Sequence, residues 1–265
     1  MIVNQCGAVM SAMPNILLLG GTTEASALAE MLARHGVRAT FSYAGRTANP
    51  RGQPLPVRIG GFGGVAGLID YLRAQDVTHL VDATHPFAAT MSAHAVEAAR
   101  ATGVAHAALT RAPWVAVTGD RWSHVADIPG AVEALDGPVS RVMLALGRMH
   151  VDAFAARPQH HYLLRFVDAP DAPPALPDHR LVVDRGPFTV EGDSRLMQDH
   201  RIDLIVAKNS GGDGAAAKLA AARALGLPVL MIDRPAMPDR ITFHRPEDAL
   251  DWIGHGASSG RERGV

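Results

Sequence analysis

The stretch ILLLGGTTEA, residues 16–25, sets a short apolar run directly before two glycines and the first residues of an amphipathic segment. An unbroken run of Ile and Leu is typical of a strand that is buried on both faces of a parallel sheet. Apolar residues then recur at helical spacing from Thr22 to His35, and Gly36 is the kind of residue that ends a helix. The stretch therefore predicts a strand, a tight glycine turn and a helix.

The rest of the first half continues this alternation. Apolar segments at residues 37–43, 57–59 and 79–83 predict three further strands, and residues 67–74 and 88–102 predict helices. Strands that alternate with helices in this way indicate an α/β fold with a parallel, doubly wound sheet.

The second half of the chain repeats the sequence pattern of the first half. In each half an apolar strand is followed by an Ala-rich helix, a glycine and, after the same interval, an arginine: Gly103 precedes Arg111 as Gly226 precedes Arg234. Any two strand–helix–strand units share some of these features, but the matched order favours two similar domains. The predicted fold is α/β, with two Rossmann-like, doubly wound parallel-sheet domains in tandem and a ligand cleft between them.

A turn-forming Asp-Gly-Pro at residues 136–138 marks the predicted domain boundary. The expected domains are residues 1–137, which would bind the dinucleotide, and residues 138–265, which would bind the substrate. Each half also closes with a histidine and a short amphipathic segment, at residues 124–135 and 244–253. Because the two closing segments are alike, segment 240–253 can pack on either sheet, and the domains can exchange strands.

Composition argues against several classes of protein. A net charge of −1 disfavours a dedicated nucleic-acid binder and a polybasic membrane surface. Cys6 is the single cysteine, so neither an intramolecular disulfide nor a Cys/His zinc site is expected, which favours the reducing cytoplasm. No apolar run is long enough to predict a membrane helix. Residues 1–13 lack the features of a secretory signal and are expected to be a leader that precedes the fold.

The glycine turn suits the phosphates of a dinucleotide. Glycines allow the backbone to approach a pyrophosphate, and the N-terminus of the following helix offers unpaired amides and the positive end of the helix dipole. The turn is not a GxGxxG fingerprint, so a plain strand-to-helix turn with Thr22 as the N-cap is an equal alternative. The residues predicted to contact the cofactor here are Gly20, Gly21, Thr22, Thr23 and Glu24.

The end of the second predicted strand favours NADPH over NADH. A site that prefers NAD carries an acid there for the ribose 2′-hydroxyl, whereas this sequence has Arg46 and no acid. A planar, permanently charged guanidinium suits a 2′-phosphate, although Arg46 can also be a solvated loop charge. Two further segments, residues 60–64 and 82–87, follow other strands and should face the same crevice. The further cofactor candidates are Ser42, Gly45, Arg46, Gly61, Gly63 and Thr84.

Taken together, these motifs resemble the precorrin-6A reductases of the cobalamin (vitamin B12) pathway. The resemblance rests on residues 18–25, 44–46, 82–88, 111–114, 146–148, 184–188 and 207–212, which follow the family's order along nearly the whole globular chain. The motifs most specific to this family are DATHPF, residues 82–87, and KNSGG, residues 208–212. The resemblance implies an oxidoreductase of tetrapyrrole metabolism that passes hydride from NADPH to a double bond of precorrin-6A, giving precorrin-6B, without a metal or flavin. The motifs do not distinguish a metal-free substrate from a cobalt-containing one.

The second half supplies the cations that a polycarboxylate substrate needs. Lys208 ends an apolar strand and should emerge at the crevice, where it can pair with a substrate carboxylate, contact the cofactor or donate a proton if burial lowers its pKa. A strand-end lysine that reaches solvent is the alternative. A Gly-Pro turn can aim Arg185 inward, or Arg185 can form a salt bridge with Asp184 or Glu191. The predicted substrate-binding residues are Arg148, Arg185, Lys208, Asn209, Ser210 and Gly211.

His85 is the second catalytic candidate beside Lys208. It precedes a proline, which favours an extended backbone that points out of the sheet. A structural histidine with satisfied hydrogen bonds is an equal alternative. The other histidines show no metal-ligand spacing, so no metal site is predicted.

Other functions fit the sequence less well. A short-chain dehydrogenase would need Tyr-x-x-x-Lys, which does not occur, and a methyltransferase would need an acid after the second strand. The alternatives that stay open are a reductase of another small anionic substrate and a non-enzymatic module that senses NADPH. A hand-over of substrate or product to other enzymes of the pathway is the expected protein partnership.

Overall fold

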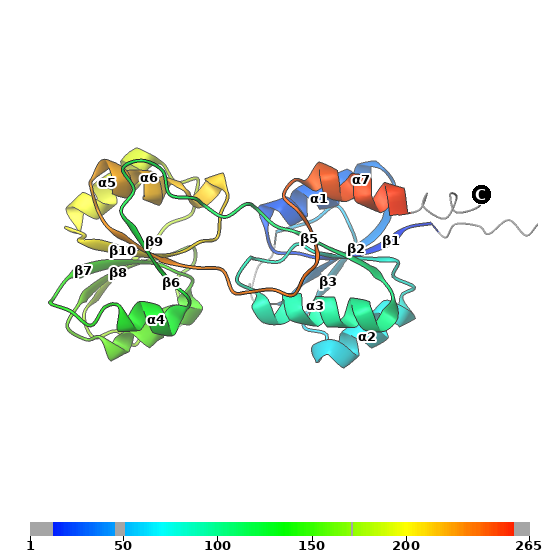
Figure 1. Ribbon diagram of the computed structural model, residues 1–265, viewed down its shortest axis with the longest axis horizontal. Coiled ribbons are helices and arrows are strands. Elements are labelled where there is room, and N and C mark those ends of the chain that lie inside the picture. The colour runs from blue at the N-terminus through cyan, green and yellow to red at the C-terminus, as the bar shows by residue number, and fades with distance from the viewer. Residues whose placement is uncertain (1–12, 46–50, 171, 257–265) are drawn as a thin grey trace, which may run out of the picture. The chain divides into compact units, whose positions relative to one another are not determined.

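The computed structural model describes residues 13–45, 51–170 and 172–256. The chain divides into two compact units, a first unit made of Met1–Arg111 with Ala236–Val265 and a second unit made of Ala112–Pro235. Within each unit, helices cover both faces of a six-stranded sheet (Figure 1). All the strand pairings in both sheets are parallel. The predicted pair of Rossmann-like parallel sheets is therefore confirmed.

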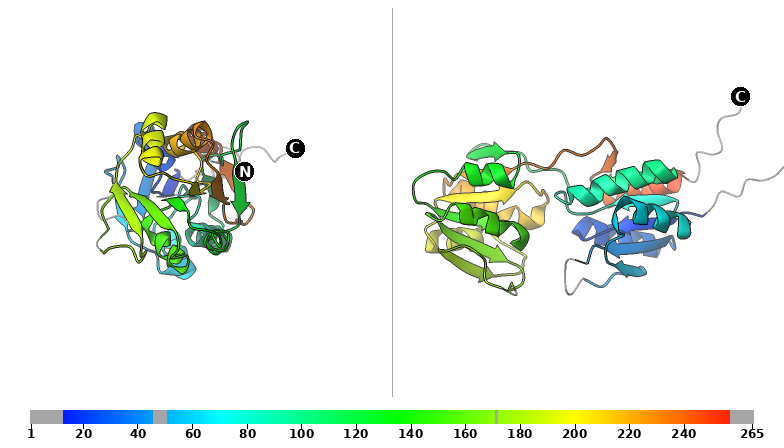
Figure 2. Two further views of the ribbon diagram at one scale, coloured as in Figure 1. Left: turned by 90° about the vertical axis from the view of Figure 1, so that its left-hand side faces the viewer. Right: turned by 90° about the horizontal axis from the view of Figure 1, so that it is seen from below.

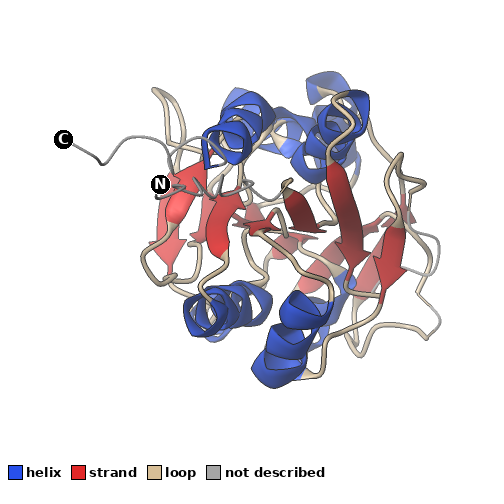
Figure 3. Cartoon of the chain, turned by 90° about the vertical axis from the view of Figure 1, so that its right-hand side faces the viewer, coloured by secondary structure: helices blue, strands red, loops and turns tan. Residues whose placement is uncertain are grey.

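The first unit alternates strands and helices from its start. Its elements are β1 (Asn15–Leu19), α1 (Thr23–Arg34), β2 (Arg38–Tyr43), β3 (Val57–Ile59), α2 (Gly64–Ala74), β4 (His79–Asp82), α3 (Ala89–Thr102), β5 (Ala105–Leu109), β12 (Ile241–Phe243) and α7 (Pro246–Gly256). The strands lie in the order β3-β2-β1-β4-β5-β12, and Figure 3 shows this sheet between its two layers of helices.

The central strand β1 is buried on both faces, as its unbroken apolar sequence predicts. Successive side chains point to opposite faces of the sheet. Ile16 and Leu18 pack in the core with α1 and α7, whereas Leu17 and Leu19 pack in the core with α2 and α3. Each face of the sheet thus rests on its own hydrophobic core, which holds the carboxyl end of β1 in place.

The second unit has the same plan. Its elements are β6 (Trp122–Val125), α4 (Ile128–Glu133), β7 (Arg141–Ala145), the 3₁₀ segment η1 (Arg148–Ala156), β8 (His161–Phe166), β9 (His179–Val183), α5 (Val190–Asp199), β10 (Leu204–Lys208), η2 (Asp213–Ala215), α6 (Ala217–Ala224) and β11 (Val229–Ile232). Its strands lie in the order β9-β8-β7-β10-β11-β6, which matches the order of the first unit strand for strand. The left view of Figure 2 shows this second unit, with helices on both faces of its sheet.

The last strand of each sheet comes from the other half of the chain. β6 follows β5 in sequence but pairs with β11 of the second unit. β12 follows β11 in sequence but pairs with β5 of the first unit. The expected exchange of closing strands therefore occurs.

The chain divides into its two units at positions that differ from the predicted domain boundary. Residues 136–138 lie inside the second unit, between α4 and β7, whereas the chain passes between units after Arg111 and after Pro235. The boundary differs from the predicted one because the strand with which a short strand pairs depends on tertiary contacts and not on its own sequence pattern.

A polar contact lies beside each exchanged strand. A buried ion pair between Arg240 and Asp82, at 2.8 Å, ties the chain before β12 to β4. A more exposed contact between His124 and Asp233, at 2.7 Å, lies beside β6.

Both sheets have a switch point beside their central strand. The chain winds outward in one direction through β1, β2 and β3 and in the other through β4, β5 and β12, and the second unit does the same around β7. In open α/β sheets, ligands bind at the carboxyl ends of the strands that flank this point. The loops after β1, β4, β7 and β10 are therefore where function is expected. No helix in the described parts of the chain is long and apolar enough to span a bilayer.

Candidate active site

The two glycines of the β1–α1 turn serve different purposes. A side chain at Gly20 would overlap the ring of Phe41, so the first glycine is required by core packing. Gly21 has φ of +131°, which side-chain-bearing residues rarely adopt, and a Cβ there would meet no atom within 4 Å. Open space at Gly21, directly before a helix N-terminus, is the feature that a closely approaching phosphate requires.

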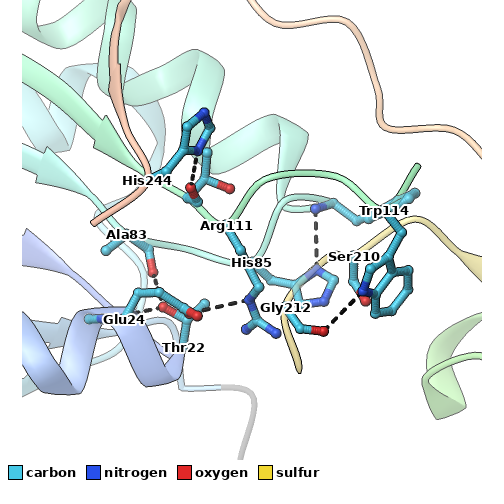
Figure 4. A network of polar contacts seen from close by, with 12 residues as sticks. Thr22, Glu24, Ala83, His85, Arg111, Trp114, Ser210, Gly212 and His244 are labelled. Atoms are coloured by element: carbon cyan, nitrogen blue, oxygen red, sulfur yellow. Dashed lines mark hydrogen bonds and ion pairs between the residues drawn. The ribbon is translucent and has the colours of Figure 1, made fainter. Parts of the chain in front are cut away.

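Thr22 is the N-cap of α1. Its hydroxyl accepts a hydrogen bond from the amide of Ala25 at 3.1 Å and donates one to the carbonyl of Ala83 at 2.9 Å (Figure 4). The hydroxyl hydrogen is therefore used within the protein, and Thr22 is suited to contact a phosphate through its backbone. The amides of Thr23 and Glu24 precede the first intrahelical bond, which joins Ser26 to Thr22.

Glu24 pairs with Arg111, which follows β5. The Arg111 Nε lies 3.2 Å from a carboxylate oxygen of Glu24, and both side chains are largely buried (Figure 4). This pair fixes the first turn of α1 against the carboxyl end of β5. Arg111 belongs to a motif quoted above, but the sequence did not indicate its partner because the two residues are far apart along the chain.

The end of β2 lies beside the end of β3. Ser42 is buried and directly opposite Arg58 in the register of the two strands. Gly45 has φ of +77° and lies against Gly60. Arg46, the predicted partner of a 2′-phosphate, lies outside the described residues. Gly61 and Gly63, in the loop after β3, offer open space for a Cβ, and Gly63 precedes α2 with φ of +79°.

The loop after β4 is held by the buried carboxylate of Asp82. Its oxygens accept hydrogen bonds from the hydroxyls of Thr84, at 2.6 Å, and Ser92, at 2.5 Å. The predicted cofactor residue Thr84 therefore has its hydroxyl hydrogen engaged. His85 is exposed, and its Nδ1 accepts a hydrogen bond from the amide of Phe87 at 3.2 Å. In the neutral ring, Nε2 then carries the proton.

The turn after β7 differs from its counterpart in the first unit. Gly147 has an ordinary φ of −70°, and no side chain caps the helix that follows. That helix is the 3₁₀ segment η1, and it begins at the exposed Arg148. The second unit thus presents a cation where the first unit presents helix amides.

Lys208 is the last residue of β10 and is half-buried. Burial lowers the pKa of its ammonium from the usual 10.5 to about 8. A lysine with a pKa near neutrality can give up a proton and recover it from water at physiological pH. The strand-end position predicted for Lys208 is therefore found in a setting that suits proton transfer.

The residues after Lys208 hold the incoming chain. The Asn209 side chain accepts from the amide of Trp114 at 2.8 Å and donates to its carbonyl at 3.0 Å. A Cβ at Gly211 would overlap the carbonyl of Ala112, and Gly212 accepts a hydrogen bond from the Trp114 indole at 3.0 Å (Figure 4). Asn209 and Gly211, predicted as substrate contacts, thus have structural roles. Arg234 donates to the carbonyls of Asn209 and Ser210, at 2.9 and 3.1 Å.

Arg185 lies in the loop after β9 and is exposed. It forms an ion pair with Asp168 and donates to the carbonyl of Val167, in the loop after β8. The salt bridge that sequence reasoning considered thus has a different partner. Three exposed apolar side chains lie at or just beyond the ends of β7, β8 and β9; they are Met149, Val167 and Val183.

Comparison with known proteins decides the family. Residues 15–254 match the model of the precorrin-6x reductase CbiJ/CobK family. The chain belongs to this family. It is 59% identical to a precorrin-6A reductase of Rhodobacter capsulatus, over 93% of this chain and 98% of that protein. It is 30% identical to a cobalt-precorrin-6A reductase of Priestia megaterium, over 83% of this chain and 90% of that protein.

A solved structure agrees with this assignment. The CobK precorrin-6A reductase is 59% identical in sequence and matches with a TM-score of 0.86, over 91% of this chain and 96% of that chain. The strand order and the exchanged closing strands described above thus belong to a member of the precorrin-6x reductase family.

Within this family member, each unit gathers its own part of the predicted site. The first unit brings together the turn after β1, the end of β2 and the loops after β3 and β4 at one edge of its sheet. The second unit does the same with Arg148, Arg185 and Lys208. Arg58 was missed, although an arginine in a short apolar strand just before two glycines was a usable signal.

Proposed function

We propose that this chain is an NADPH-dependent reductase that converts precorrin-6A into precorrin-6B in cobalamin biosynthesis. The observation that carries the proposal is the β1–α1 turn, where Gly21 leaves open space at the switch point and α1 begins. Membership of a reductase family supports the proposal that this turn binds the cofactor. The names of the relatives at 59% identity supply the substrate.

The first unit binds the nicotinamide dinucleotide. Its pyrophosphate would lie over Gly21 and accept hydrogen bonds from the amides at the start of α1, as anions do at helix N-termini. When bound, the reduced nicotinamide supplies a hydride. The Thr22 hydroxyl and the Glu24–Arg111 pair position the turn and do not themselves contact the cofactor.

The second unit binds the tetrapyrrole. The exposed side chains of Met149, Val167 and Val183 offer an apolar surface for the face of the macrocycle. Arg148 and Arg185 lie in the same set of loops and are suited to the acetate and propionate carboxylates of the ring. A surface that is apolar with cations near it fits a wide polycarboxylate better than it fits a small polar substrate.

Lys208 is the proton donor in this proposal. Reduction of a carbon–carbon double bond adds a hydride to one carbon and a proton to the other, so the protein must supply an acid. The Lys208 ammonium, with a pKa of about 8, gives its proton to the second carbon and regains one from water. His85, whose Nε2 carries a proton in the neutral ring, is the alternative donor.

Two finer points rest on the sequence. The preference for NADPH over NADH was inferred from the absence of an acid after β2 and from Arg46. A cytoplasmic location and a hand-over to other enzymes of the pathway are further expectations of this function.

The decisive experiment mixes the purified chain with NADPH and precorrin-6A. We expect loss of the reduced nicotinamide absorbance only when both are present, and a product that has gained two hydrogens by mass spectrometry. Tight NADPH binding without turnover of any tetrapyrrole would instead support a sensing module. The same assay with cobalt-precorrin-6A determines whether the metal-free substrate is preferred, as the higher identity to the precorrin-6A reductases suggests.

A further inference from the structure

Arg58 occupies the adenosine end of the cofactor edge. It lies on β3 directly opposite Ser42, which is the last residue but one of β2. In a Rossmann-like unit the ribose of the adenosine lies beyond the end of this second strand. The position is the one at which an enzyme that prefers NAD would hold the 2′-hydroxyl with an acid.

The Arg58 guanidinium is held in place by neutral groups. It donates to the carbonyls of Gly60, at 2.5 Å, and Gly61, at 2.7 Å, and makes a longer contact of 3.4 Å with the Ser42 hydroxyl. Its carbon lies 3.8 Å from the centre of the Phe62 ring and 5.4 Å from that of Tyr71. These contacts fix the plane of the guanidinium before any ligand arrives, which lowers the entropy cost of binding.

The positive charge of Arg58 is not neutralised within the described parts of the chain. Arg240 pairs with Asp82, and Arg165 of the second unit pairs with the buried Asp193. Among the described residues, no carboxylate lies within ion-pair distance of Arg58. A guanidinium stays protonated at all physiological pH values. A partly buried, fixed and uncompensated cation is a site for an anion.

The donors that remain on Arg58 suit a phosphate. A guanidinium has five N–H groups, and the contacts above use two on Nη1 and one on Nη2. Within the described residues this leaves the Nε–H and one Nη2–H, and the Nε and Nη2 nitrogens share one edge of the guanidinium. Two parallel N–H groups are the arrangement that binds a phosphate through two oxygens.

We propose that Arg58 binds the 2′-phosphate of NADPH and thereby sets the preference of this reductase for NADPH over NADH. The inference rests on the proposed function, because it needs a dinucleotide at the edge of the first unit. It assigns cofactor discrimination to a residue of β3, in addition to or in place of Arg46.

The test compares Arg58→Met with Arg73→Met. Methionine keeps an apolar side chain against Phe62 but removes the charge, and Arg73 is an exposed arginine in the last turn of α2 of the same unit. The dissociation constants of NADPH, NADH and adenosine 2′-monophosphate are measured by titration. Loss of two charge-assisted hydrogen bonds should weaken NADPH and adenosine 2′-monophosphate by about tenfold or more. NADH should change by less than about twofold, and Arg73→Met should change none of them.

The outcomes separate this inference from the proposed function. Equal weakening of NADPH and NADH by Arg58→Met would mean that Arg58 supports the adenine or the loop, and an unchanged NADPH affinity would leave discrimination to Arg46; either result overturns the inference and leaves a reductase. A wild-type chain that binds neither dinucleotide removes the proposed function itself. Arg58→Lys guards against a folding defect, since the ammonium keeps the charge without the two-pronged geometry and should retain part of the preference.

Discussion

The two units have the same strand order but different turns after their central strands. In the first unit β1 runs through Gly21, at φ of +131°, into a regular α-helix capped by Thr22. In the second unit β7 runs through Gly147, at φ of −70°, into the 3₁₀ segment that begins with Arg148. One turn exposes backbone amides at the N-terminus of an α-helix, and the other exposes a cationic side chain.

Under the proposed function, this difference teaches how one fold can serve two ligands. Helix amides and a glycine without steric contacts suit the compact charge of a pyrophosphate. Arginine and lysine side chains reach outward and suit carboxylates that are spread around a flexible ring. The proposed division between a cofactor unit and a substrate unit therefore rests on the loops at the switch points, since the sheets themselves are alike.

The largest expected effect is at Lys208, the ionisable end of β10. Lys208→Ala should lower kcat by about 10²–10⁴-fold, the usual contribution of a general acid, while the dissociation constant of NADPH changes little. Single-turnover reduction and a nucleotide titration measure the two quantities. A variant with full kcat would move the proton donor to another residue, His85 first.

The pH dependence of the wild type sharpens this prediction. Only the protonated amine donates, so kcat should fall as pH rises through the Lys208 pKa of about 8. Lys208→Arg keeps a cation that stays protonated across this range, so its lower kcat should lose that pH dependence. A fall at the same pH in the arginine variant would assign the titration to a different group.

A second large effect is expected where the first unit holds its exchanged strand. Arg240→Met leaves the buried Asp82 carboxylate without its cation and should lower the free energy of unfolding by about 3 kcal/mol, the lower end for a broken buried pair. The lower end applies because Thr84 and Ser92 still donate to the carboxylate. Urea denaturation measures the change.

The matched control is Arg245→Met, which lies two residues beyond β12 and forms an exposed pair with Glu247. Exposed pairs contribute about 0–1 kcal/mol, so this variant should unfold almost as the wild type does. If both variants cost the same, the Asp82–Arg240 pair does not anchor the exchanged strand. The corresponding contact beside β6, between His124 and Asp233, is half-exposed and should behave like the control.

Much of the fold followed from local pattern. The strand before Gly20 and the helix after it were predicted because an apolar run, a glycine pair and a capping threonine all lie within a few residues of one another. The equivalence of Gly103 and Gly226 was likewise visible, and both have positive φ next to the ends of α3 and α6. The exchange of β6 and β12 was foreseen as possible, but the domain boundary was misplaced, because strand pairing depends on distant contacts such as Asp82 with Arg240.

The candidate site was predictable in position but less so in detail. Lys208 and Arg148 lie at the strand ends at which their sequence context predicts them. The side chains of Thr84 and Asn209 instead hydrogen-bond within the protein, and a motif does not show whether a polar group will find a partner in its own fold. The arginine before Gly60 and Gly61 was a usable signal for Arg58, but its alignment with Ser42 depends on the register of β3, which periodicity does not reveal.

A smaller effect should separate the two turn glycines. Gly21→Ala forces a side-chain-bearing residue into a disfavoured φ and places a methyl group where a phosphate would lie, so NADPH should bind about tenfold to 100-fold more weakly. Gly147→Ala has an ordinary φ and open space for its methyl group, and should leave the NADPH dissociation constant unchanged. Equal effects at both positions would contradict the division between the units.

The smallest effect should come from the Thr22 hydroxyl, for which the second turn has no counterpart. Thr22→Ala removes the N-cap of α1 and the bond to Ala83, and should lower the free energy of unfolding by about 1 kcal/mol. Thr22→Ser keeps both hydrogen bonds and should restore most of that stability. Because the hydroxyl is used within the protein, NADPH affinity should change little in either variant; a loss of affinity in Thr22→Ala that greatly exceeds the loss of stability would mean that the hydroxyl turns to the phosphate when the cofactor binds.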